Sequence, residues 1–341
     1  MPQKARARRA FAVHGVAVRT SSASPALLGV VDELLAPFAV ADDPPAARSA
    51  ITVRLSERDA PRLPARRAEW FTYAPLRCTT DACCGYTEYD GQYVARLALA
   101  TGTITVWAPP RLGIEPWMLG HAVVMPLLVE ALRGRGLSSL HAAALVDGGR
   151  AVLLPGASGV GKSTLALALL RGGFALLADD APFARRAADG VTLCAYAEPL
   201  NVTGATARFF ADLAPRWRAG ARDARGKVAF AAADLAGAVA QSAPAALLLF
   251  PIVGAAERSR VAPLAKSDAL RRLLGASMPA ATSACAAEQF LLLAELVRQA
   301  DCYSLTTGRD FDALPALVRQ LLHDRHLAGA RDAADAARGH A

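Results

Sequence analysis

The sequence predicts an α/β protein with two domains, and three observations support this prediction. A short apolar strand, residues 151–154, is followed by a glycine-rich loop and then by an apolar helical segment, residues 163–170. Other apolar runs alternate between strand-like and helix-like segments along most of the chain. With 341 residues, of which 53% are hydrophobic, the chain is long enough to bury a full core and to form two domains.

The glycine-rich loop contains the pattern GxxxxGK[ST], known as the Walker A motif, and it lies between the predicted strand and helix. In this pattern, backbone N–H groups at the helix start surround a polyphosphate, and the helix dipole favours its charge. Lys162 is expected to reach the terminal phosphates, and Ser163 to bind Mg²⁺. The residues predicted to bind a nucleoside triphosphate are Gly156, Ala157, Ser158, Gly159, Val160, Gly161, Lys162, Ser163 and Thr164.

A second predicted strand, residues 174–178, ends in two adjacent carboxylates, Asp179 and Asp180. Carboxylates beside a phosphate-binding loop can hold Mg²⁺ or take a proton from an attacking hydroxyl. Neighbouring side chains on a strand point to opposite faces, so one carboxylate can face the metal while the other faces the acceptor. The later apolar strand, residues 245–250, ends in Pro251 without an acid, and the Leu-Ser-Gly-Gly signature of ABC-type ATPases is absent. The early acidic pair is therefore the better candidate for metal and base.

A histidine stands at the start of the preceding predicted strand, residues 140–146. His141 precedes Lys162 by 21 residues, and Asp179 follows Lys162 by 17. The order of His141, the loop and the acidic pair resembles the catalytic core of HPr kinase/phosphorylase and the HPr-kinase-related proteins. The specific motifs of this resemblance cover residues 137–183. The resemblance implies a P-loop core of the type shared by the HPr kinase C-terminal domain and PEP carboxykinase.

The resemblance also implies a role for each of these side chains. Lys162 and Ser163 would bind the phosphates of ATP and Mg²⁺. Asp179 would act as the base on a substrate serine hydroxyl, Asp180 would support the metal, and His141 would lie close to the reacting phosphate. The implied activity is that of an ATP- and Mg²⁺-dependent kinase acting on a serine or threonine of a protein or peptide.

One part of the family's pattern is absent. HPr kinases carry a downstream Glu-Ile-Arg-Gly segment whose Glu completes the metal site, whereas residues 196–202 of this chain read Tyr-Ala-Glu-Pro-Leu-Asn-Val. Glu198 is the nearest carboxylate and a candidate metal ligand, with a solvated loop residue as the alternative. The missing segment argues against the reverse phosphorylase reaction and against HPr as the acceptor. The chain is more similar to the HPr-kinase-related enzymes of peptide-modification clusters, which phosphorylate a precursor-peptide serine.

A basic segment with one glycine, residues 222–227, follows the acidic pair in sequence. Lys227 in this segment could bring positive charge to the transferred phosphate, and Gly226 would give a closing loop its conformational freedom. The alternative is a charged loop that only faces solvent. Lys227 is therefore included among the candidate catalytic residues.

Composition excludes several other classes of protein. The net charge of +8 suits a protein that handles polyphosphate or an acidic peptide. Nucleic-acid binding is not expected, because the arginines are scattered, aromatics make up 6%, and no zinc-finger, RNP or helix-turn-helix signature is present. The six cysteines lack CxxC spacing, which favours a reduced, cytoplasmic protein. No window reaches the roughly 20 apolar residues that a membrane-spanning helix needs.

We expect three regions along the chain. Residues 1–112 would form an N-terminal α/β or mostly β module for substrate docking or oligomer contact, with a purely structural role as the alternative. Residues 113–327 would form the kinase domain, beginning with a buried helix near residues 117–132. Residues 328–341 would be a disordered tail or a frayed helix. The elements expected in the first region are strands near residues 11–18, 51–55, 86–98 and 101–107 and a helix near residues 25–35.

Two alternative functions stay open. One is a nucleotide-binding regulatory or assembly module that hydrolyses ATP slowly, and the other is a small-molecule kinase, because no pattern in the sequence identifies the acceptor. The sequence also leaves open the choice between ATP, GTP and pyrophosphate. A homo-oligomer is implied only by the family, in which hexamers and smaller assemblies occur.

Overall fold

The computed structural model describes residues 6–41, 50–110, 115–196, 198–223, 225–235 and 237–323, so the expected tail at 328–341 lies outside the described residues. The chain divides into two compact units. The first unit contains residues 1–138 and 278–289, and the second contains residues 139–277 and 290–341. Within the described residues, no helix combines the length and the apolar character needed to cross a membrane.

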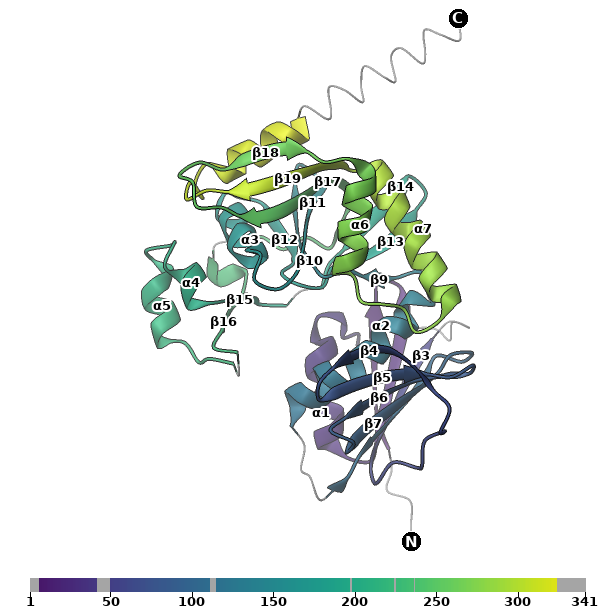
Figure 1. Ribbon diagram of the computed structural model, residues 1–341. Coiled ribbons are helices and arrows are strands. Elements are labelled where there is room, and N and C mark those ends of the chain that lie inside the picture. The colour runs from purple at the N-terminus through teal and green to yellow at the C-terminus, as the bar shows by residue number, and fades with distance from the viewer. Residues whose placement is uncertain are drawn as a thin grey trace, which may run out of the picture. The chain divides into compact units, whose positions relative to one another are not determined.

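The described part of the first unit is built on an eight-stranded mixed sheet (Figure 1). Its strand order is β1-β2-β3-β8-β7-β6-β5-β4, with β3 parallel to both β2 and β8 and the other neighbours antiparallel. The strands are β1 (Ala7–Val13), β2 (Val16–Ser22), β3 (Ile51–Glu57), β4 (Ala68–Tyr73), β5 (Leu76–Thr80), β6 (Cys84–Tyr89), β7 (Tyr93–Ala98) and β8 (Thr103–Ala108).

The single strand expected near residues 11–18 is in fact a hairpin. Val13 pairs with Val16, and the two residues between them, His14 and Gly15, have positive φ angles of 47° and 89°. Two consecutive positive φ angles are typical of the tight turn of a two-residue hairpin, and they reverse the chain here. Because apolar residues continue on both sides of the turn, the hydrophobic periodicity of the sequence did not indicate this reversal.

Helices cover one face of this sheet. They are α1 (Pro25–Leu35), the short 3₁₀ turn η1 (Ala36–Phe38), the π-helical segment η3 (Met118–Val124) and α2 (Met125–Arg133). Ser24 caps α1 by accepting a hydrogen bond from the Leu27 amide, which confirms the helix expected at residues 25–35. The buried helix expected at residues 117–132 is also present, as η3 and α2. It packs on β6 and β7, so the first unit extends to Ser138 rather than ending at residue 112.

A nine-stranded mixed sheet, counted over the described residues, organises the second unit (Figure 1). Its centre runs β12-β10-β11-β17, with β19 and then β18 continuing beside β17. β10 is antiparallel to β11 and β12, whereas β17 is parallel to β11 and β19. The strands are β9 (Ser138–Ser139), β10 (Ala142–Asp147), β11 (Arg150–Pro155), β12 (Ala175–Ala178), β13 (Phe183–Ala187), β14 (Gly190–Cys194), β17 (Ser242–Val253), β18 (Arg260–Pro263) and β19 (Asp301–Thr307).

Helices pack on both faces of this sheet and give a three-layer α/β/α arrangement. α3 (Lys162–Arg171) and the helix at residues 314–323 share one core with alternate strand residues such as Val152 and Leu154. α6 (Lys266–Ala276) and the C-terminal part of α7 (Ser283–Gln299) share the other core with the intervening residues, including Leu153. The alternation along the apolar strand therefore buries both of its faces.

A small two-stranded sheet lies on the same side as α3. β15 (Leu200–Val202) pairs antiparallel with β16 (Val228–Phe230), and their apolar side chains belong to the core that α3 shares. The short helices that accompany this pair are α4 (Gly204–Ala207), α5 (Leu213–Ala219) and η4 (Ala233–Leu235). Both strands therefore share a core with the helix that follows the glycine-rich loop.

Candidate active site

The glycine-rich loop joins the end of β11 to the start of α3, as the sequence predicts. Gly159 and Gly161 have φ angles of 88° and 94°, a region that favours glycine because it has no Cβ. Gly161 caps α3, and its carbonyl accepts the first helical hydrogen bond from the Leu165 amide at 3.0 Å. The loop therefore has the backbone freedom and the helix N-terminus that an anion-binding turn requires.

Lys162 is the first residue of α3, and its side chain turns back over the loop. Its ammonium group donates hydrogen bonds to the carbonyl oxygens of Gly156 and Ala157 at 2.8 and 3.1 Å. Burial lowers the pKa of Lys162, and the negative charges of Asp180 and Asp179 oppose that shift. The side chain is 7% exposed, so this cation is held at the loop rather than extended into solvent.

His141 connects Lys162 to the acidic pair. The Lys162 ammonium lies 3.0 Å from His141 Nε2, and His141 Nδ1 lies 2.9 Å from Asp180 Oδ1. Because an ammonium group can only donate, Nε2 acts as the acceptor, and Nδ1 therefore carries the hydrogen that is donated to Asp180. Lys162 itself is 3.9 Å from the same carboxylate oxygen. The three side chains form one continuous polar chain beside the loop.

Asp180 keeps half of its side chain open to solvent, with 51% exposed. Burial of the remainder would raise its pKa, but the hydrogen bond from His141, followed by the charges of Lys162 and Lys227, holds the pKa below its usual value. Its backbone carbonyl accepts a hydrogen bond from the Ala142 amide at 3.1 Å, next to His141. The local pairing of these two segments thus fixes the contact between histidine and carboxylate.

Asp179 has a different environment, with only 3% of its surface exposed. Its Oδ2 accepts a hydrogen bond from the Asn201 amide of β15 at 3.0 Å, while Oδ1 is buried and has no hydrogen-bond partner among the described residues. Burial raises the pKa of Asp179, and hydrogen bonding from the Asn201 amide and the Ser163 side chain partly offsets the rise. Asp179 therefore faces the Ser163 end of the loop.

Glu198 completes a group of acidic side chains near the loop. Burial raises its pKa to about 7, and the negative charges of Asp180 and Asp179 add to the rise. The positive charge of Arg225 acts in the opposite direction. Glu198 is thus partly buried and electrostatically coupled to the acidic pair, and its role as a metal ligand stays a prediction.

Two residues that sequence patterns did not single out also lie at the site: Asn201, whose backbone amide donates to Asp179, and Thr206. The hydroxyl of Thr164, one residue after Ser163, lies 2.8 Å from the hydroxyl of Thr206 in α4. Thr206 is in turn 3.2 Å from Thr203, which caps that short helix. Together with the Asn201 contact, this chain of hydroxyl groups fastens β15 and α4 to the loop. No local motif marks Asn201 or Thr206, because only the packing of β15 brings them here.

Lys227 lies in the turn that leads into β16. Its positive charge acts on the pKa values of Lys162, Asp179 and Asp180, which places it within electrostatic reach of the site. The turn itself is fastened by the Asp223 carboxylate, which accepts the Lys227 amide at 2.8 Å. Lys227 therefore belongs to a charged surface turn, and its charge also acts on the acidic pair.

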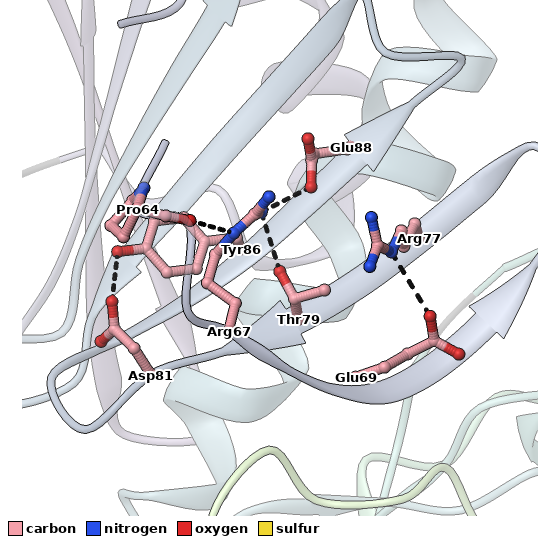
Figure 2. Close-up of polar contacts among 8 residues, drawn as sticks. All are labelled: Pro64, Arg67, Glu69, Arg77, Thr79, Asp81, Tyr86 and Glu88. Carbon is pink, nitrogen blue, oxygen red and sulfur yellow. Dashed lines mark hydrogen bonds and ion pairs between the residues drawn. The ribbon is translucent and has the colours of Figure 1, made fainter. Parts of the chain in front are cut away.

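The first unit contains a separate polar cluster on its sheet (Figure 2). The Arg67 guanidinium donates to the Pro64 carbonyl, the Thr79 hydroxyl and the Glu88 carboxylate, and it also lies over the Tyr86 ring. A polar hollow of about 470 Å³ opens beside Arg67 and Glu88. The contacts of Arg67 fasten the segment before β4 onto the sheet. Arg67 and Glu88 also neutralise each other's charge, so the cluster does not resemble a catalytic site.

No family model matches the chain, and no curated protein matches it. Among solved structures, the chain is similar to the Hpr(Ser) kinase/phosphatase from Coxiella burnetii, with 15% sequence identity and a TM-score of 0.29. The match covers 56% of this chain and 97% of that one. Likeness at this level does not define a site or an activity for the chain.

Proposed function

We propose that the second unit is an ATP- and Mg²⁺-dependent phosphotransferase that moves the γ-phosphate to a serine or threonine hydroxyl of a protein or peptide. One observation carries this proposal. The hydrogen-bonded chain from Lys162 through His141 to Asp180 joins a phosphate-binding cation to a solvent-accessible carboxylate beside a glycine-rich helix N-terminus. Such a site offers both functions that phosphoryl transfer needs, positioning of the phosphates and removal of the hydroxyl proton.

The loop would bind the triphosphate through its backbone amides. The two carbonyl contacts of Lys162 show that its ammonium group is already directed at the loop, where phosphate oxygens can replace the carbonyls of Gly156 and Ala157. The α3 dipole adds favourable electrostatic energy for an anion at this end of the helix. Binding of the polyphosphate thus requires little rearrangement of the cation.

The hydroxyl and carboxylate oxygens at the site are ligands that suit Mg²⁺. The described residues contain no cluster of three or more His, Cys, Asp or Glu side chains in ligand geometry, but Mg²⁺ on nucleotides commonly uses few protein ligands together with phosphates and water. Ser163 would bind the ion, and the unpartnered Oδ1 of Asp179 beside it would accept from the ion's water shell. Glu198 and Asp180 are the further carboxylates within electrostatic range. When bound, the ion would neutralise charge on the transferred phosphate.

The general base in this proposal is Asp180, which differs from the assignment to Asp179 that the resemblance implies. A base must meet the acceptor hydroxyl, and Asp180 is half exposed whereas Asp179 is almost fully buried. Its lowered pKa keeps Asp180 ionised near neutral pH, ready to accept a proton. His141 orients this carboxylate through the bond from Nδ1.

The reaction step balances with these groups. The acceptor oxygen bonds to the γ-phosphorus as the bond from that phosphorus to the β,γ-bridging oxygen breaks, and ADP leaves with the bond's electrons. The hydroxyl proton passes to Asp180 and from there to solvent. Lys162 stays beside the phosphate oxygens, and Lys227 would add a second positive charge from the turn before β16.

Transfer of label from γ-labelled ATP tests the proposal. We expect label to enter serine-containing peptides with the wild-type chain, to fall about 10²- to 10⁴-fold with Asp180→Asn, and to disappear with Lys162→Ala. Asp212→Asn changes an exposed carboxylate paired with Arg171 and is the matched control. Nucleotide binding without transfer to any serine, threonine or small-molecule acceptor would reject the kinase.

One alternative has a specific observation in its favour. The open side of Asp180 can orient a water molecule as well as a hydroxyl, so a slowly hydrolysing ATPase that acts by changing shape fits the same groups. Steady release of labelled phosphate without transfer to an acceptor would favour that function. The acceptor, any homo-oligomer and a cytoplasmic location stay predictions.

A further inference from the structure

We infer that Asp223 is a positioning residue that closes a turn and thereby holds Lys227 facing the γ-phosphate of the bound nucleotide. This inference rests on the proposed function, because it assigns the turn a task at that site. From the sequence, residues 222–227 were expected to form either a mobile cationic loop or a surface loop. The hydrogen bonds within the turn point instead to a cationic group that is organised in advance.

A single carboxylate closes this turn. Asp223 Oδ1 accepts hydrogen bonds from the backbone amides of Arg225 and Lys227 at 2.9 and 2.8 Å, and Oδ2 accepts from Arg225 Nε at 3.1 Å. The backbone of Asp223 adds two further bonds, one to the Lys227 carbonyl and one from the Gly226 amide. Gly226 has a φ of 73°, which favours glycine at this point of the turn.

The chain that enters the turn is fastened to β15. The Arg222 guanidinium lies 4.6 Å from the centre of the Trp217 ring, and Trp217 Nε1 donates to the Val202 carbonyl at 3.0 Å. Val202 ends β15, whose strand partner β16 begins directly after Lys227. Both sides of the turn are thus tied to the same two-stranded sheet.

That sheet connects the turn to the acidic pair. Ala229 of β16 pairs with Asn201 of β15, and the Asn201 amide donates to Asp179. Lys227 therefore stands two residues from a strand position whose partner binds the buried carboxylate. The effect of its charge on the pKa values of Asp179 and Asp180 agrees with this short connection.

The physical consequence is preorganisation. A flexible lysine loses side-chain and backbone freedom when it is ordered at a phosphate, whereas a turn already closed by Asp223 has lost most of the backbone part. A fixed positive charge aimed at developing negative charge is an effective form of transition-state stabilisation. Asp223 itself would touch no substrate and would act through Lys227.

The experiment compares Asp223→Ala, Asp223→Asn and Lys227→Ala with Asp212→Ala, an exposed carboxylate that pairs with Arg171 outside the turn. The first readout is amide hydrogen exchange at Arg225 and Lys227 in the nucleotide-free protein. We expect exchange to become about 10-fold faster in Asp223→Ala, because the amides lose their acceptor. Asp223→Asn should restore much of the protection, since its side-chain oxygen can still accept both amides.

The second readout is kinetic. Asp223→Ala and Lys227→Ala should each lower kcat about 10-fold or more with little change in KM for the acceptor, and the double variant should be no worse than Lys227→Ala alone. The inference is wrong if exchange in Asp223→Ala equals that of the wild type, if exchange rises while kcat stays unchanged, or if the double variant loses activity additively. A wild type that neither binds nor turns over ATP would reject the proposed function, and the exchange readout would still test whether Asp223 orders the turn.

Discussion

Asp179 and Asp180 are adjacent in sequence, yet the first is 3% exposed and bonded to a strand amide, whereas the second has 51% of its side chain open and contacts His141. The opposite directions of their pKa shifts follow from these surroundings: burial raises the pKa of Asp179, whereas for Asp180 the hydrogen bond from His141 and the charges of Lys162 and Lys227 together outweigh the effect of burial. The two carboxylates are therefore suited to different tasks.

The first prediction separates these tasks. Asp179→Asn should weaken Mg²⁺-dependent nucleotide binding, because the buried side chain loses the charge that faces Ser163. Asp180→Asn should leave nucleotide affinity within a few-fold of the wild type and reduce transfer. Titration calorimetry with ATP, with and without Mg²⁺, measures the first effect, and labelled transfer measures the second. The reverse pattern would restore Asp179 as the base.

The second prediction concerns the pH dependence of transfer. The hydrogen bond from His141 holds the pKa of Asp180 down against the effect of burial, so His141→Phe should raise that pKa. A base must be ionised to act, and the acidic limb of the kcat profile should therefore move to higher pH. His121→Phe, which changes a histidine stacked on Trp117 in the first unit, serves as the control. An unmoved limb would show that Asp180 is not the group that titrates.

The third prediction tests the loop backbone. Gly161→Ala puts a Cβ at a φ of 94° and should cost about 1–3 kcal/mol of local strain, with a matching loss of nucleotide affinity. Gly148→Ala at φ 54°, in the β10–β11 turn, should lower stability without changing nucleotide affinity. Thermal unfolding and calorimetry on both variants give the comparison. Equal affinity in the two variants would contradict a role for the Gly161 conformation in binding.

The fourth prediction concerns stability in the absence of nucleotide. Glu198 has a pKa of about 7 in the folded chain and an ordinary value of 4.5 when unfolded, so the folded state binds the proton more tightly. This contribution to stability is full below pH 4.5 and is lost as the pH rises through about 7. The free energy of unfolding of Glu198→Gln should therefore rise, relative to that of the wild type, by about 1–3 kcal/mol as the pH goes from 5 to 8. Urea unfolding at both pH values measures it, and parallel profiles would contradict the raised pKa.

Local patterns in the sequence were sufficient for the central strand, loop and helix. Residues 151–170 combine an apolar strand, positive-φ glycines and a helix start, and each of these signals is contained within a few neighbouring residues. The helix at residues 25–35 was also predictable, because Ser24 and Pro25 mark its start. The contacts among His141, Lys162 and the acidic pair follow from strand ends that meet at one edge.

Contacts made by distant segments were not predictable. Asn201 binds Asp179 only because β15 packs into the α3 core, and Asp223 orders its turn through its own side-chain oxygens rather than through a recognisable motif. The domain boundary at residue 112 missed the packing of α2 on the first sheet for the same reason, since a buried helix does not indicate which sheet covers it.

Titration of the chain with ATP and Mg²⁺ by calorimetry tests the central claim most directly, because every proposed role depends on nucleotide binding at the loop. We predict saturable heat with one site per chain for the wild type and its loss in Lys162→Ala, with folding of the variant checked by circular dichroism. An absence of heat in the wild type, or equal affinity in a folded Lys162→Ala, would contradict the account.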